Sequence, residues 1–197
     1  MRRVSVIGGS CTGKTTLARE LAVRLGVPFV ELDALHHDAG WEEAPADMLR
    51  ERVEAALAAA PDGWVVDGNY HGKIGTYVQE RADTVVFLDL PHRTAIRRVL
   101  WRTLRRSVTR EELWNGNRES LRLAFSRDSI VWWVIRQHGS YRTKWEPRFV
   151  PLTGVQIVRL RTLREVRDWL QSIQPTESMS GSSNGSERQK TPPFVET

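Results

Sequence analysis

The sequence has a single cysteine, Cys11, and no long apolar run. An internal disulfide is therefore excluded, which fits a reducing compartment. The longest strongly apolar run in the second half, residues 130–135, is far shorter than the roughly 20 residues that a membrane-spanning helix needs. The first seven residues lead directly into Gly8-Gly9, without the longer apolar stretch and cleavage site of a signal peptide. We therefore expect a cytoplasmic protein with no membrane contact.

Positive charge is concentrated in one part of the chain. The net charge is +5, whereas residues 93–148 hold 14 Lys and Arg against five Asp and Glu. Such a basic segment suits a nucleic acid, a polyphosphate or an acidic membrane surface. No helix-turn-helix or zinc-binding pattern accompanies it. Contact with nucleic acid therefore stays an alternative that no motif supports.

Segments typical of strands alternate with segments typical of helices over residues 1–173. Apolar and β-branched runs predict strands at 3–7, 28–32, 64–66, 84–88 and 155–160. Amphipathic or basic segments predict helices at 14–25, 47–60, 91–106, 118–138 and 163–173. This alternation predicts an α/β domain with a parallel sheet covered on both faces. Residues 174–197 are rich in Ser, Gly, Thr, Pro and Glu, which predicts a disordered tail.

Residues 8–15 match the phosphate-binding pattern G-x-x-x-x-G-K-[ST] at every fixed position. A predicted strand precedes the motif and a predicted helix follows it, as this loop requires. Backbone N–H groups at the helix N-terminus then face the phosphates, and Lys14 places a cation on the β and γ phosphates. The Thr15 hydroxyl is a candidate Mg²⁺ ligand, and Thr16 is a candidate donor to the α phosphate. We predict a nucleoside triphosphate site made of Gly8, Gly9, Ser10, Cys11, Thr12, Gly13, Lys14, Thr15 and Thr16.

Asp67 ends the predicted strand at 64–66. Three apolar residues followed by Asp is the pattern of the second metal-site strand in P-loop proteins. The carboxylate then lies within reach of Mg²⁺, usually through water. Together with Thr15, Asp67 predicts the metal site.

Asp33 follows the predicted strand at 28–32. Ligands of open α/β sheets bind beyond the carboxyl ends of the strands, so Asp33 is a candidate to orient or deprotonate an acceptor hydroxyl. The neighbouring run His36-His37-Asp38 fits a metal site, although such a run in a loop is more often solvated polar surface.

Arg98 and Arg102 are four residues apart and share one face of the predicted helix 91–106. Guanidinium groups bind phosphate oxygens in bidentate fashion and stabilise charge during phosphoryl transfer. The alternative is a solvated basic face whose aliphatic stems pack on apolar neighbours.

These motifs resemble the adenylate kinase and shikimate kinase group of small P-loop kinases. Beyond the phosphate loop, the likeness lies in Asp67-Gly68 at a strand end and in Phe87-Leu88-Asp89-Leu90-Pro91 before the arginine helix. The resemblance implies a three-layer P-loop NTPase fold, with a five-stranded parallel sheet in the order 2-3-1-4-5 and a helical lid at about 103–125. It also implies that Arg98 and Arg102 contact the adenine and phosphates of ATP.

The chain departs from these families directly after Gly68. Adenylate kinases carry an arginine nearby that holds the AMP phosphate, and shikimate kinases have a glycine run, whereas this chain has Asn69-Tyr70-His71. These side chains suit a neutral acceptor. We expect the acceptor site to include Asp33, Asp67, Gly68, Asn69 and Tyr70. The Asp-Gly-Asn-Tyr loop and residues 114–119, Trp-Asn-Gly-Asn-Arg-Glu, are most similar to bacterial proteins labelled adenylate-kinase-like or DNA topology modulation proteins.

Together these features predict an ATP- and Mg²⁺-dependent phosphotransferase formed by residues 1–173. Its acceptor would be a small molecule, either a nucleotide or a hydroxyl metabolite. The candidate catalytic residues are Lys14, Asp33, Asp67, Arg98 and Arg102. One alternative is a nucleotide-binding regulator that contacts nucleic acid through residues 93–148, and another is an NTPase whose acceptor is water.

Overall fold

The computed structural model describes residues 1–91, 93, 96, 98, 101, 115 and 152–175. The predicted lid at 103–125 falls outside them apart from residue 115, as do the predicted helix at 118–138, Arg102 and the predicted tail beyond residue 175. Of the predicted helix 91–106, residues 91, 93, 96, 98 and 101 are described; Pro91 is not helical, and the other four are.

Five parallel strands form one sheet in the order β2-β3-β1-β4-β5. The strands are β1 (Arg3–Gly8), β2 (Phe29–Glu31), β3 (Trp64–Asp67), β4 (Thr84–Leu88) and β5 (Gln156–Leu160). The structure thus confirms the predicted α/β class and the order 2-3-1-4-5. The central strand β1 pairs Val6 with Asp67 on one side and Gly8 with Leu88 on the other. This register brings the ends of β1 and β3 to the same edge of the sheet.

Three longer helices agree with prediction to within about two residues at each end: α1 (Lys14–Leu25), α3 (Ala46–Ala58) and α8 (Leu163–Ser172). Gly26 ends α1 in the left-handed conformation, with φ of 62°. Four short elements are not predicted: α2 (Leu32–His36), α4 (His71–Ile74) and the 3₁₀ turns η1 (Ala39–Trp41) and η2 (Gln79–Arg81). The predicted strand 28–32 therefore stops at Glu31, because Leu32 already begins α2.

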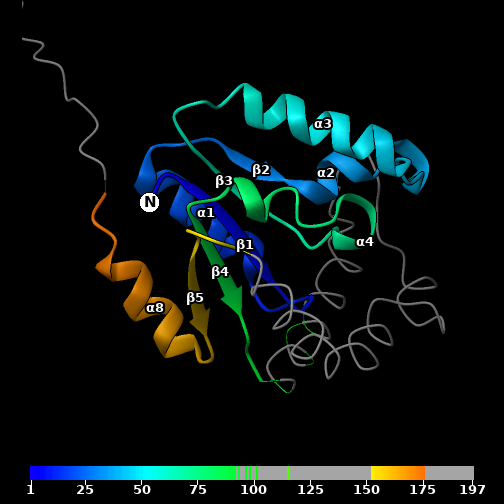
Figure 1. Ribbon diagram of the computed structural model, residues 1–197. Coiled ribbons are helices and arrows are strands. Elements are labelled where there is room, and N and C mark those ends of the chain that lie inside the picture. Colours follow the sequence, from blue (N-terminus) through cyan, green and yellow to red (C-terminus); the bar gives the residue numbers. More distant parts are fainter. Residues whose placement is uncertain are drawn as a thin grey trace, which may run out of the picture.

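Two apolar clusters lie on opposite faces of the sheet, and neighbouring strand residues alternate between them. Val66 packs with α3, α2 and α4 in one cluster, whereas Val65 packs with α1 and α8 in the other. Phe87 and Val86 of β4 divide in the same way. Helices α3 and α8 accordingly lie on opposite sides of the sheet (Figure 1). This three-layer arrangement leaves the carboxyl edge of the strands for the polar residues described below.

No helix in the described part of the chain combines the length and the hydropathy that crossing a membrane requires.

Candidate functional site

The loop between β1 and α1 has the backbone geometry of a phosphate cradle. Gly13 precedes α1 with φ of 98°, and Cys11 also has a positive φ of 61°. The loop is closed internally, since Thr12 Oγ1 donates to the Gly9 carbonyl at 2.8 Å and Lys14 Nζ donates to the same oxygen at 3.0 Å. The N-cap residue of α1, Gly13, has no side chain that could cap the helix. Its first N–H groups are thus left for an anion.

Asp67 lies beside this loop and contacts Thr15, its partner in the predicted metal site. Thr15 Oγ1 donates to Asp67 Oδ2 at 2.5 Å. The other carboxylate oxygen, Oδ1, is buried and has no hydrogen-bond partner among the described residues. Burial raises the pKa of Asp67, while the charge of Lys14 and the hydrogen bond from Thr15 act in the opposite direction.

A hard cation fits this arrangement. An unpartnered buried carboxylate oxygen beside a hydroxyl offers the oxygen ligands that Mg²⁺ prefers. The described residues contain no cluster of three or more His, Cys, Asp or Glu that would hold a metal by itself. A cation at Asp67 and Thr15 would therefore take its other ligands from water and from the phosphates of a bound nucleotide.

Arg98 reaches the phosphate loop from the helix that follows β4. Its Nη1 donates to the Thr12 carbonyl at 2.5 Å. A Cβ atom added to Gly13 would lie 2.7 Å from the same nitrogen, so the glycine permits both the positive φ and the approach of the guanidinium. The structure thus brings Arg98 to the predicted nucleotide site.

Asp33 is the second residue of α2 and is hydrogen-bonded to Tyr70. The Tyr70 hydroxyl donates to Asp33 Oδ1 at 2.7 Å and lies 3.4 Å from His37 Nε2. Burial, followed by the charge of Asp33, raises the pKa of Tyr70 far above its ordinary value, so the hydroxyl keeps its proton. The charge of Asp33 also contributes to the raised pKa of Asp67. The two carboxylates are therefore close enough to interact.

Asn69 binds the phosphate loop. The Gly8 N–H donates to Asn69 Oδ1 at 3.2 Å, and Asn69 Nδ2 donates to the Gly8 carbonyl. Both halves of the amide are thus engaged with one residue of β1. Gly68, beside it, has φ of 144° and would place an added Cβ 2.7 Å from Leu32 Cβ. Sequence reasoning gave Asn69 and Gly68 an acceptor-binding role, which stays a prediction, and it missed the contact with Gly8.

In the run His36-His37-Asp38, His36 is a core residue and not the solvated polar surface weighed from the sequence, and it belongs to no metal-ligating cluster of the described residues. His36 is buried, with Nε2 3.4 Å from Glu43 Oε2, and Asp38 accepts two hydrogen bonds from Arg52 at 3.0 and 3.1 Å. Burial, together with the charge of Lys73, lowers the pKa of His36. His36 is therefore an uncharged core residue, and Asp38 is committed to an ion pair.

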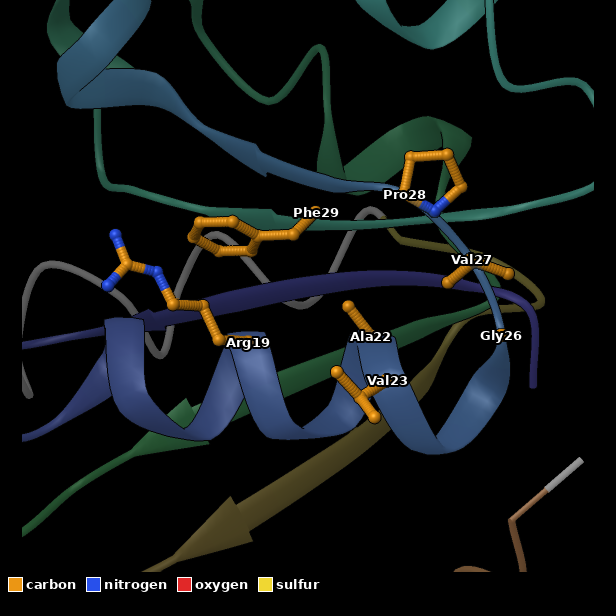
Figure 2. A pocket seen from close by; sticks show the side chains of 7 residues that line it. All are labelled: Arg19, Ala22, Val23, Gly26, Val27, Pro28 and Phe29. Carbon is orange, nitrogen blue, oxygen red and sulfur yellow. The ribbon is translucent and has the colours of Figure 1, made fainter. Parts of the chain in front are cut away.

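A hollow also lies at the opposite end of α1 from the phosphate loop. It lies between the C-terminal half of α1 and the beginning of β2 (Figure 2), and its walls are Arg19, Ala22, Val23, Gly26, Val27, Pro28 and Phe29. The lining is mainly apolar, and Arg19 is turned to Phe29 and to Glu31. The groups described above at the carboxyl edge do not contribute to it.

Comparisons with known proteins show which proteins this chain is similar to. A family model described as ATPase family associated with various cellular activities (AAA) matches residues 4–99, just under half of the chain. A shikimate kinase from Nitratidesulfovibrio vulgaris is 31% identical over 106 residues, which are 45% of this chain and 58% of that protein. The chain thus matches less than two thirds of the length of this curated relative.

Two solved structures have the same architecture over most of their length. The shikimate kinase from Bacteroides thetaiotaomicron has a TM-score of 0.51 at 16% identity, covering 87% of this chain and 95% of that one. The shikimate kinase from Acinetobacter baumannii, solved in complex with shikimate, has a TM-score of 0.53 at 18% identity, covering 88% and 90%. The chain has the fold of a small P-loop kinase.

Proposed function

We propose that this protein is an ATP- and Mg²⁺-dependent phosphotransferase whose acceptor is a hydroxyl group of a small metabolite. The supporting observation is that a phosphate cradle and a carboxylate paired with a protonated phenol share one edge of the sheet. Asn69 contacts the cradle, and the next residue, Tyr70, contacts Asp33. The donor and acceptor halves of a kinase site are thereby one residue apart in the chain. The likeness to shikimate kinases supports the same activity.

On the donor side, the N–H groups of the loop and Lys14 bind the phosphates of ATP. Thr15 and Asp67 hold Mg²⁺, which neutralises charge on the transferring group when bound. Arg98 lies against the loop, where its guanidinium stabilises the charge that develops on the phosphoryl oxygens.

On the acceptor side, Asp33 accepts the proton of the attacking hydroxyl. Tyr70 keeps its proton and donates to Asp33, which fixes the carboxylate's orientation. The described cations near this side, Arg52 and Lys73, are each paired with an acid, Asp38 and Glu43 respectively. An acceptor without a phosphate group fits these surroundings better than a nucleoside monophosphate does.

Phosphate transfer from labelled ATP to a panel of hydroxylated metabolites, with shikimate as its first member, tests the proposal. We expect Lys14→Ala to lower kcat/KM by about 100-fold and to weaken ATP binding. Asp33→Asn should lower transfer by a similar factor while leaving ATP affinity unchanged. The proposal fails if ATP turnover is the same with and without every acceptor, because water is then the acceptor. It also fails if Lys14→Ala transfers phosphate as the wild type does.

Two further assignments are a likeness to DNA topology modulation proteins and contact with nucleic acid. The similarity to DNA topology modulation proteins depends on the loop Asp67–Tyr70 and on residues 114–119, of which only Asn115 is described in the second segment. Nucleic-acid binding would depend on residues 93–148, most of which lie outside the described part. Binding to DNA that weakens steeply with salt would support both.

A further inference from the structure

Asn69 extends the pairing of β1 and β3 beyond the end of the backbone ladder. The ladder pairs each β1 residue with the β3 residue 61 positions later, ending at Val6 and Asp67. The Gly68 N–H still reaches the Val6 carbonyl at 3.3 Å. Asn69 follows at the same offset from Gly8, and its side-chain amide takes the place of the backbone groups. The N–H group and the carbonyl of Gly8 together fix the orientation of the Asn69 amide, because only Nδ2 can donate to the carbonyl.

Tyr70 is anchored equally firmly on its other side. Its carbonyl accepts the N–H groups of Lys73 and Ile74, both at 2.9 Å, which ties it to α4. Lys73 in turn donates to Glu43 and to the Ala44 carbonyl, both at 3.0 Å. The Tyr70 ring packs against His36, with 4.5 Å between ring centroids. The hydroxyl that meets Asp33 is therefore held by a packed element.

We infer that Asn69 and Tyr70 form a strut, meaning two consecutive positioning residues that fix the phosphate loop and Asp33 relative to each other. The inference rests on the proposed function. It differs from the acceptor-binding role expected from the sequence, because each side chain holds part of the protein. In-line transfer requires the nucleophile and the γ phosphate to be placed to within a fraction of an ångström. A strut anchored at Gly8 and at Asp33 supplies that constraint.

Three variants test the strut. Asn69→Asp keeps the size of the side chain but turns an oxygen towards the Gly8 carbonyl, and we expect it to weaken binding of a non-hydrolysable ATP analogue about tenfold. Asn69→Ala removes both hydrogen bonds without adding charge and should act in the same direction. Tyr70→Phe removes only the hydroxyl, so analogue affinity should stay within about twofold while kcat/KM for the acceptor falls about tenfold. Tyr77→Phe, in the same apolar cluster, is the matched control and should change neither quantity.

The double variant Asn69→Asp/Tyr70→Phe separates a strut from two independent contacts. Once one end is released, the other end no longer fixes the separation. The factor by which kcat at saturating ATP falls in the double variant should therefore be smaller than the product of the factors measured for the two single variants. Urea unfolding of each variant shows whether the fold is retained. The strut is refuted if the losses multiply, or if both Asn69 variants bind the analogue like the wild type.

Failure of the proposed function would be recognised separately. In that case the wild type transfers phosphate to no acceptor, and ATP hydrolysis replaces transfer as the measured rate. The Asn69 effect on analogue affinity is still expected, because it depends only on the phosphate loop.

Discussion

Substitution of Gly68 should lower both the stability of the fold and the activity of the proposed site. It has φ of 144°, and an added Cβ would lie 2.7, 2.9 and 3.0 Å from the Cβ, Cδ1 and Cγ atoms of Leu32. Leu32 is 1% exposed and cannot move outward freely. On the other side, the Gly68 N–H is bonded to the Val6 carbonyl. Gly68→Ala therefore forces either the loop or the start of α2 to shift.

The expected loss combines two terms. Overpacking of a buried site costs about 1–3 kcal/mol, and backbone in a sparsely populated region adds about 1 kcal/mol. The free energy of unfolding should thus fall by about 2–4 kcal/mol. With an m-value of about 2 kcal/mol/M, the midpoint of urea unfolding moves down by about 1–2 M. Tryptophan fluorescence measures this midpoint.

Gly72→Ala is the matched control. Gly72 lies in α4 only four residues away, and an added Cβ would meet no atom within 4 Å. Alanine is the better helix former, so this change should be neutral or stabilise by up to about 1 kcal/mol. Gly68→Ala should also weaken both ATP binding and phosphate transfer, because Asn69 or Asp33 must move with the displaced segment. If Gly68→Ala unfolds at the wild-type urea concentration, or if Gly72→Ala is equally damaging, the packing argument is wrong.

Other consequences concern the donor side. Burial raises the pKa of Asp67, so folded-state stability should decline as the pH rises from the unfolded pKa of this group through its folded pKa. Asp67→Asn should remove that decline and raise the unfolding free energy at neutral pH by on the order of 1 kcal/mol, which Tm against pH measures. The same variant should lose Mg²⁺-dependent ATP binding, which calorimetry with and without Mg²⁺ measures. Arg98→Lys loses the fork that reaches Thr12 and should lower kcat about 100-fold with an unchanged unfolding midpoint, and an unchanged kcat would remove Arg98 from the mechanism. Gly13→Ala would place a Cβ 2.7 Å from Arg98 Nη1 and should weaken ATP binding at least tenfold, whereas wild-type affinity would show that neither the positive φ nor the close approach is needed.

The donor side was largely predictable from the sequence because its signals are local. The glycines, Lys14 and Thr15 of the phosphate-binding motif lie within eight consecutive residues, and a strand and a helix flank the motif. Asp67 was predicted from a second local pattern, an apolar run that ends in a carboxylate. The pairing of Asp67 with Thr15 then follows from the strand order, which places β3 beside β1.

The acceptor side was less predictable because its elements are short. α2 and α4 have five and four residues, too few for a hydrophobic period to appear. The sequence therefore placed Asp33 at a strand end, whereas it lies on a helix. For the same reason His36 was interpreted as either a metal ligand or polar surface, although it is buried.

Asn69 is the most informative case. An amide that binds a ligand and an amide that binds its own backbone are the same residue in a sequence. The distinction here depends on the register of β1 and β3. Val6 pairs with Asp67, so Gly8 faces Asn69 two residues further along each of the two segments. A slip of one residue in a predicted strand would turn the neighbouring side chains to the opposite faces of the sheet. Roles that depend on register thus require the structure. Asn69 was expected to contact the acceptor because its amide suits hydrogen bonding to a neutral molecule. The contact with Gly8 supplies a different reason for an amide at this position: its two hydrogen bonds extend the pairing of β1 and β3 beside the phosphate loop.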